Sequence, residues 1–243
     1  MSDFIKSANL PDKKIKTVLI GHHIEIIERL NSLGIKTIVL EDNPDVDFSV
    51  RNHADMSALH LGGNSIFLDR RQVSAAEKLG AYGLSVILTE ENISGAYPND
   101  VRLNCAIVGE KLICGKKGVE PQVLDMPFEK IAVNQGYCKC SICILNEKAI
   151  ITDDESIFKA TKDILDVLLI EKGDIQLENK DYGFIGGAGA KLNADTIMFF
   201  GSLKYHRNGE QIKSFLSKYK MKHIELFDGK LRDIGSIIPI FEE

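Results

Sequence analysis

Cysteine, histidine and aspartate residues that could support nucleophilic chemistry lie in two short segments of the chain. Residues 138–143 read CKCSIC and bring three thiols close to one lysine. His53 and Asp55 lie two residues apart, earlier in the chain. A neighbouring lysine or histidine lowers the pKa of a thiol, and the thiolate is the nucleophile. Cys140, Cys143 and His53 are therefore the candidate catalytic residues, and buried inert cysteine is the alternative interpretation for either thiol.

Closely spaced thiols also suggest a metal centre, because thiolates bind zinc and iron–sulfur clusters. A second cysteine pair at suitable spacing is missing, although Cys105 and Cys114 could approach from another part of the fold. If residues 140–143 form an extended strand, Cys140 and Cys143 also point to opposite faces. We therefore expect no metal and no cofactor.

The elements that must position these residues follow a repeated plan. Four segments each contain an apolar stretch, a tight polar turn and a second apolar stretch, at residues 56–68, 103–114, 140–152 and 188–200. Their turns read GGN, GEK, NEK and NAD, and glycine or asparagine in a turn tolerates the positive φ of a tight hairpin. The pattern predicts four β-hairpins.

A helix and one further strand are predicted after most of these hairpins. The helices are expected over residues 73–82, 154–164 and 210–219, and the strands over 84–88, 167–170 and 223–227. In the last helix Ile212, Phe215, Leu216 and Tyr219 fall on one face. The second hairpin is followed by a proline-punctuated link at 121–127, so its helix is expected to be short or absent.

The two ends of the chain together supply a fifth unit. A strand is predicted at residues 234–240, and a strand, helix and strand at 17–20, 24–33 and 37–40. Joined through space, they repeat the strand–strand–helix–strand order in permuted form, which leaves no exposed sheet edge. We predict one α/β domain over residues 1–243, a five-repeat ββαβ β/α propeller. Its repeats are approximately 53–90, 100–134, 137–170, 183–227 and 231–240 joined to 15–41, and a generic α/β sandwich is the alternative.

The repeated unit resembles the pentein fold of the guanidino-group-modifying enzymes. These include arginine and agmatine deiminases, amidinotransferases and dimethylarginine hydrolases. The segments that carry the resemblance are residues 53–56 (HADM), 136–141 (GYCKCS), 182–189 (YGFIGGAG) and 200–203 (FGSL). It covers about residues 15 to 240, is closest to a branch without an assigned activity, and implies a pentein-type propeller closed by the N- and C-terminal segments.

In such a ring the first strand of each unit faces a central channel, so residues aligned on the turns share a position. The residues seven positions before each turn are Asp55, Arg102, Lys139 and Gly186. The residues five positions before each turn are Ser57, Asn104, Ser141 and Ala188. The residues expected to bind substrate are Asp55, Arg102, Asn104, Lys139, Asp233 and Ser236. The aspartates suit a cation and Arg102 a carboxylate, whereas a self-paired charged plug is the alternative. The same alignment turns Cys143 toward the channel and packs Cys140 outward.

The resemblance implies a thiolate nucleophile on the fifth unit and an acid–base histidine on the fourth. Residues 186–189 (GGAG) contain no histidine and residues 233–237 (DIGSI) no cysteine, and Ser236 stands about where the nucleophile would be. Our first hypothesis is a channel for a small guanidino or amino-acid-type ligand, with thiol-dependent C–N hydrolysis or group transfer if it is an enzyme. The second is a non-catalytic protein that binds a ligand or partner and has lost the triad.

Composition and charge argue against several classes of binding partner and cellular location. The formal net charge of −5 and the pI of about 5.7 argue against a nucleic-acid or anionic-membrane surface. The sequence shows no apolar run of the roughly 20 residues that span a bilayer and no apolar leader region. Five cysteines, an odd number, favour free thiols in a reducing compartment. We expect a cytoplasmic protein with a small-molecule ligand, no nucleic-acid or membrane partner, and possible homo-oligomerisation.

Overall fold

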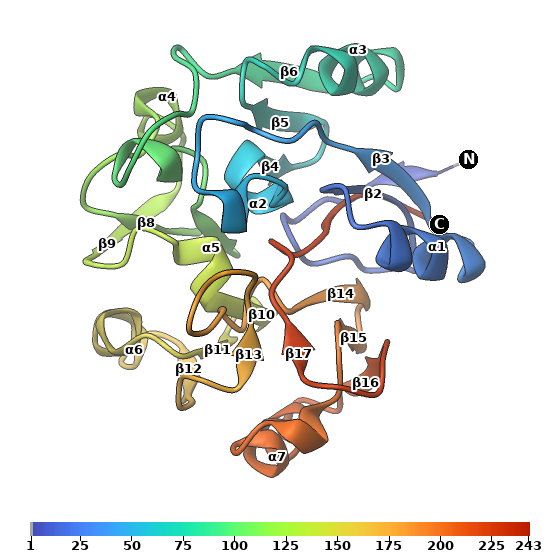
Figure 1. Cartoon of the computed structure of the whole chain (residues 1–243), viewed down its shortest axis with the longest axis vertical. Coiled ribbons are helices and arrows are strands. Elements are labelled where there is room, and N and C mark those ends of the chain that lie inside the picture. Colours follow the sequence, from blue (N-terminus) through green and yellow to red (C-terminus); the bar gives the residue numbers. More distant parts are fainter. Residues whose placement is uncertain (1) are drawn as a thin grey trace.

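The computed structural model describes residues 2–243. Within this range the strands form six small sheets, and in five of them an antiparallel strand pair is extended by a parallel strand. Figure 1 shows these five sheets arranged around a common centre, with the larger helices on the outside. The fold is thus mixed α/β, built from several small mixed sheets.

Four of the five sheets are formed by consecutive strands, and each of these sheets together with its helix makes one unit. The first contains β4 (Ala58–Gly62), β5 (Ser65–Leu68), α3 (Val73–Ala81) and β6 (Ser85–Leu88). The second contains β7 (Ala106–Val108), β8 (Lys111–Gly115), α4 (Pro121–Leu124) and β9 (Glu129–Val133). The third contains β10 (Ile142–Asn146), β11 (Ala149–Thr152), α6 (Glu155–Thr161) and β12 (Asp166–Leu169). The fourth contains β14 (Gly189–Asn193), β15 (Thr196–Phe199), η3 (Leu203–Tyr205), α7 (Gly209–Lys218) and β16 (Lys222–Glu225).

The remaining sheets join distant parts of the chain. The C-terminal strand β18 (Ile238–Glu242) pairs antiparallel with β2 (Ile15–Ile20), which pairs parallel with β3 (Lys36–Val39) after α1 (Ile24–Ser32). The short strand β1 (Asp3–Phe4) adds to the other side of β18. The predicted pairing of the two chain ends is therefore observed. In the sixth sheet, β13 (Ile175–Gln176) pairs parallel with β17 (Leu231–Arg232).

The predicted hairpins and helices are present, but the first strands begin later than expected. Residues 54–57 and 138–141 form single helical turns, α2 (Ala54–Ser57) and α5 (Cys138–Ser141), and a 3-10 turn η2 (Asn99–Val101) precedes β7. Inside α5 the amide of Ser141 donates to the carbonyl oxygen of Tyr137, and strand pairing starts only at Ile142. The prediction that residues 53–57 and 140–141 continue the strands is wrong, and period-two alternation does not apply to them.

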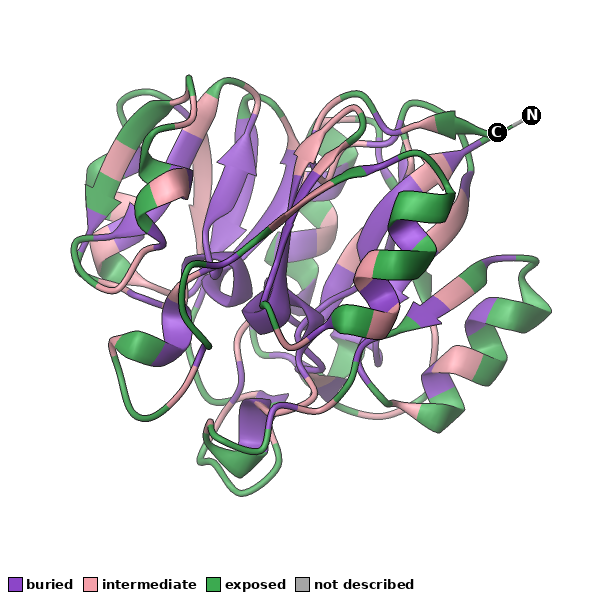
Figure 2. Cartoon of the chain, turned by 90° about the horizontal axis from the view of Figure 1, so that it is seen from above, coloured by how far each residue is buried: buried purple, intermediate pink, exposed green. Residues whose placement is uncertain are grey.

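The core fills the space between the sheets and the outer helices. Figure 2 shows buried residues concentrated on the strands, while the helices expose their outer faces. In α7, Ile212 and Leu216 are fully buried, and Phe215 and Tyr219 pack against the same cluster, which confirms the predicted helix face. Within residues 2–243, no helix has both the length and the apolar character needed to cross a lipid bilayer.

A buried histidine in β4 is expected to make stability fall in mild acid. His60 is 2% exposed, its Nε2 lies 3.1 Å from the carbonyl oxygen of Gly63, and burial lowers its pKa to about 4. The unfolded chain therefore takes up a proton near pH 6.5 that the folded protein binds only near pH 4. The stability lost on acidification through this window is about 3 kcal/mol.

The substitution His60→Gln should remove that loss, because glutamine can still donate to Gly63 but does not ionise. Urea unfolding of both proteins at pH 7 and at pH 4.5 measures it. The wild type should lose more free energy of unfolding than the variant between these two pH values. Equal losses in the two proteins would show that His60 is not the source.

Candidate functional site

Five polar side chains from four separate segments meet in one buried cluster. They are His53 and Asp55 at the turn α2, Asn104 before β7, Cys140 in α5 and Asp233 after β17. None of the five is more than 6% exposed. The helical turns α2 and α5 position His53, Asp55 and Cys140 just before their strands begin, and Asn104 and Asp233 reach them from irregular segments. We call these five residues the polar cluster.

Asn104 organises one side of the polar cluster. Its Nδ2 donates to Cys140 Sγ at 3.1 Å and to the carbonyl oxygen of Asp55 at 3.2 Å. Its Oδ1 accepts from the backbone amide of Lys139 at 2.8 Å and from that of Cys140 at 3.3 Å. The thiol of Cys140 in turn donates to Asp55 Oδ2 at 3.1 Å. Asn104 therefore fixes both the turn α5 and the position of its sulfur.

His53 and Asp233 form the other side. Asp233 accepts hydrogen bonds from the amides of Phe184 at 2.9 Å and Gly235 at 3.0 Å, and its Oδ1 lies 3.8 Å from His53 Nδ1. That separation is too long for a hydrogen bond. His53 Nδ1 and Asp55 Oδ1 are both buried without a hydrogen-bond partner. The polar cluster thus keeps unused bonding capacity at its centre.

Two glycines make room for these side chains. A Cβ atom on Gly187 would lie 1.8 Å from Asp233 Oδ1, and a Cβ on Gly235 would lie 2.3 Å from that of His53. Gly235 also has φ +70°, a conformation that other residues rarely adopt. Gly187 of the GGAG segment therefore allows the side chain of Asp233 to approach the backbone closely.

The environment of the polar cluster raises the pKa of its acidic groups. Burial raises the pKa of Asp55 and, to about 6, that of Asp233. Burial, followed by the nearby carboxylates of Asp55 and Asp233, raises the pKa of Cys140 well above its usual value. Burial lowers the pKa of His53. Without a bound cation, Cys140 is therefore a neutral thiol and His53 a neutral imidazole at neutral pH.

An aromatic cavity leads to the polar cluster. It has a volume of about 320 Å³, and Cys140 and Asp233 are part of its lining. Tyr137, Phe184 and Tyr182 also line it. The rings of Tyr137 and Phe184 stack with centroids 6.2 Å apart, and the ring of Tyr182 meets that of Phe184 edge-on at 6.0 Å. Aromatic rings thus line the same cavity as the thiol of Cys140 and the carboxyl group of Asp233.

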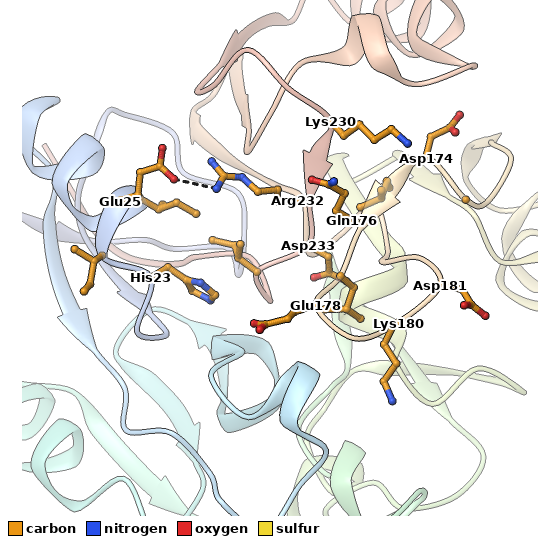
Figure 3. Close-up of a pocket in the computed structure, with 16 residues that line it drawn as sticks. His23, Glu25, Asp174, Gln176, Glu178, Lys180, Asp181, Lys230, Arg232 and Asp233 are labelled. Carbon is orange, nitrogen blue, oxygen red and sulfur yellow. Dashed lines mark hydrogen bonds and ion pairs between the residues drawn. The ribbon is translucent and has the colours of Figure 1, made fainter.

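A second, larger cavity reaches Asp233 from another side. Figure 3 shows it between His23 and Glu25 at the start of α1, the segment 174–181, and residues 230–233. Its volume is about 720 Å³, and Arg232 pairs with Glu25 across one wall at 2.9 Å. The residues that line both cavities are Leu177, Lys180, Asp181 and Asp233. The segment 177–181 therefore separates two approaches to the same carboxyl group.

The structure divides the residues singled out from the sequence into three groups. The polar cluster unites His53, Asp55, Asn104, Cys140 and Asp233. Lys139, Cys143 and Ser236 line a separate cavity of about 20 Å³, where Ser236 Oγ donates to the carbonyl oxygen of Gly189. Arg102 is held elsewhere by ion pairs to Glu91 and, at 3.0 Å, to the buried Glu120.

The expectation that Cys140 packs outward is wrong, because its thiol bonds to Asp55 and Asn104 inside the polar cluster, whereas Cys143 lines the small cavity with Lys139 and Ser236. That expectation assumed an extended strand, whereas Cys140 lies on a helical turn and Cys143 on β10. The aromatic lining was not predicted either. Its signals in the sequence are Tyr137 beside Cys138 and the two aromatic residues that flank Gly183 in the strand-free segment YGF, residues 182–184.

Comparison with known proteins agrees with this architecture. The model of a family of unknown function, DUF6873, matches residues 19–238. An inosamine-phosphate amidinotransferase from Streptomyces griseus superposes with a TM-score of 0.61 at 11% identity, covering 98% of this chain and 97% of that one. An amidinotransferase of saxitoxin biosynthesis from Microseira wollei gives 0.57 at 11% identity over 91% of each chain. A dimethylarginine dimethylaminohydrolase from Pseudomonas aeruginosa gives 0.53 at 11%, covering 87% and 92%.

These similarities show that the fold is that of the pentein enzymes. A local sequence match also exists to an argininosuccinate synthase from Pelagibacter ubique (strain HTCC1062). It is 36% identical over 81 residues and spans 28% of this chain and 20% of that protein. So short a match carries no conclusion about the remainder of either protein.

Proposed function

We propose, given that this chain belongs to the DUF6873 family and has the pentein fold, that its aromatic cavity binds a small guanidino or amino-acid-type ligand. At that site the chain would carry out thiol-dependent C–N hydrolysis or group transfer. The proposal includes a single domain in which the five sheets close into a propeller, with the terminal strand β18 completing the fifth unit. One observation carries it: a thiol, an imidazole and two carboxyl groups meet beside an aromatic cavity.

The cavity suits a flat, delocalised cation. A guanidinium group can stack on the rings of Tyr137 and Phe184 and hydrogen-bond to the carboxylate of Asp233. Asp55 lies behind Cys140 and accepts its thiol proton in a hydrogen bond. Burial, and after it the carboxylates of Asp55 and Asp233, hold the pKa of Cys140 high, and a cation in this place would offset the effect of the carboxylates. The ligand itself would therefore promote ionisation of the thiol.

The chemistry would then follow from the positions of three groups. Cys140 passes its proton to the neutral imidazole of His53 as Sγ bonds to the guanidino carbon. The departing amine takes a proton from the imidazolium when the C–N bond breaks. Water or an acceptor amine next attacks the covalent intermediate and releases the thiol. His53 is thus proposed as the acid–base group and Cys140 as the nucleophile.

A non-catalytic binding protein is the second candidate, and specific observations favour it. Cys140 is 1% exposed, and burial keeps its pKa high. In addition, the fourth unit lacks a histidine at residues 186–189 and the fifth carries Ser236 in place of a cysteine. Under this alternative the ligand binds in the same cavity and leaves unchanged.

A ligand screen tests both candidates. Guanidino compounds and amino acids would be added to purified protein, and the melting temperature and the appearance of ammonia, urea or a ureido product would be followed. Stabilisation with product supports the enzyme, and stabilisation without product supports the binding protein. If no guanidino compound raises the melting temperature, the proposed ligand class is wrong.

The variant Asp233→Asn is expected to weaken binding of a guanidinium ligand by about 10–100-fold, because a charge-assisted hydrogen bond is replaced by a neutral one. Isothermal titration measures the dissociation constant. Arg102→Gln is a matched control, since Arg102 pairs with Glu91 and Glu120 away from the cavity. Equal weakening in both variants would speak against a role for Asp233 in binding.

A further inference from the structure

Three side chains of the polar cluster have the identity and spacing of metal ligands. One potential ligand atom each from His53, Asp55 and Cys140 lie within 4.8 Å of one another, and all three residues are buried. Imidazole, carboxylate and thiolate are the donor types of protein zinc sites. Spacing in the sequence does not reveal the set, because Asp55 and Cys140 are 85 residues apart.

Unsatisfied buried atoms point to a missing ligand at the same place. His53 Nδ1 and Asp55 Oδ1 have no hydrogen-bond partner, although both residues are at least 98% buried. The nearest charged neighbour of His53, the Oδ1 of Asp233, stays 3.8 Å away. Buried polar groups are normally hydrogen-bonded or bound to a metal, so these atoms indicate that the polar cluster accommodates a further partner.

Charge favours a divalent cation as that partner. Asp55, Asp233 and Cys140 together can carry three negative charges, and the ammonium group of Lys139 is the cation that acts on both aspartates. A buried cluster of this kind is stabilised when a cation compensates its charge. Thiolate and imidazole donors select zinc over magnesium or calcium, which prefer oxygen.

We propose that His53, Asp55 and Cys140 form a three-ligand zinc site whose remaining position is turned toward Asp233 and the aromatic cavity. On binding, the S–H bond of Cys140 is exchanged for an S–Zn bond and the proton leaves to solvent. The amide of Asn104 keeps its hydrogen bond to the sulfur and orients it. The aromatic cavity, which Cys140 helps to line, is the entry path.

The geometry requires only small adjustments. Zinc bonds of about 2.0–2.3 Å in a tetrahedral site place ligand atoms roughly 3.3–3.7 Å apart. Cys140 Sγ already lies 3.1 Å from Asp55 Oδ2, so the sulfur and carboxylate are close to this arrangement. The ligand atom of the His53 imidazole lies within 4.8 Å of those of Asp55 and Cys140, and it has to move closer to both of them.

Zinc binding at this site needs no organic ligand, so its existence does not rest on the proposed C–N chemistry. The two roles of Cys140 exclude one another, since a sulfur bound to zinc is not free to attack carbon. Zinc-loaded protein should therefore show no C–N activity, and chelator-treated protein should show it. A failure to bind zinc leaves the proposed function intact, and a failure to turn over guanidino compounds leaves the zinc site intact.

The test titrates chelator-treated protein with Co²⁺ as a spectroscopic substitute, and then displaces it with Zn²⁺. One equivalent should produce a thiolate-to-cobalt charge-transfer band. In Cys140→Ser the band should vanish and zinc affinity should fall by about 100-fold or more, since even outer partners of a metal site are worth about 10–100-fold. Cys114→Ser, a substitution of another buried thiol in β8, should behave like wild type.

Two results would overturn the site: no charge-transfer band in the wild type, or wild-type zinc affinity in Cys140→Ser. If Cys140→Ser does not fold, alkylation of the wild type decides the question. Peptide mass spectrometry should show that Zn²⁺ slows alkylation of Cys140 by at least 10-fold while Cys114 is unaffected. Equal alkylation of Cys140 with and without Zn²⁺ contradicts the proposal.

Discussion

Turnover of a guanidino substrate is expected to fall by about 1,000-fold or more in Cys140→Ser, a loss of roughly 4 kcal/mol of transition-state stabilisation. A serine hydroxyl is far less acidic than a thiol, and a cation bound at Asp233 cannot ionise it near neutral pH. Because serine keeps nearly the same shape, Asn104 can still donate to its side chain. Substrate affinity should consequently change much less than the turnover number.

Steady-state kinetics of wild type and Cys140→Ser measure the effect. Trapping the wild type during turnover should reveal a covalent adduct on the peptide that contains Cys140. Cys114→Ser is the matched control, because Cys114 is buried in β8 and packs in an apolar cluster. An adduct on another residue, or unchanged turnover in Cys140→Ser, would exclude Cys140 as the nucleophile.

The elements that sequence could predict are those with local signals. Glycine and asparagine turns such as residues 62–64 mark the hairpins, and the apolar spacing in residues 210–219 marks α7. The pairing of β18 with β2 was also predictable, because each end of the chain supplied only part of a unit that was complete elsewhere. The repeated unit thus predicts a pairing between distant strands that neither segment predicts by itself.

The site was harder to predict because its geometry is set by tertiary contacts. A helical turn of four residues, such as α5, is too short to show a helical period, so the sequence pattern predicts a strand at Cys140. Asn104, which bonds to the amides of α5, lies on another unit and gives no local sign of that role. The side-chain position of Arg102 likewise depends on Glu120, a partner that alternation along a strand cannot identify.

Gly187→Ala is expected to destabilise the fold by about 3–5 kcal/mol, since the new methyl group displaces a buried, doubly hydrogen-bonded carboxyl group. The Cβ atom would lie 1.8 Å from Asp233 Oδ1 and 2.6 Å from its Cγ. Asp233 cannot retreat easily, because the Cα side of Gly183 already packs so closely that a Cβ there would lie 2.5 Å from Asp233 Cβ. The carboxyl group must therefore give up its bonds to the amides of Phe184 and Gly235.

Urea unfolding of Gly187→Ala and Gly229→Ala measures the difference. Gly229 has open space around its missing Cβ, so its substitution should change the free energy of unfolding by no more than about 0.5 kcal/mol. The double variant Gly187→Ala with Asp233→Ala separates the cause, because truncation of Asp233 removes the atoms that the methyl group meets. Gly187→Ala should cost much less in the Asp233→Ala background than in the wild type. An equal cost in both backgrounds would show that Gly187 is required for the backbone path of this segment and not for the position of Asp233.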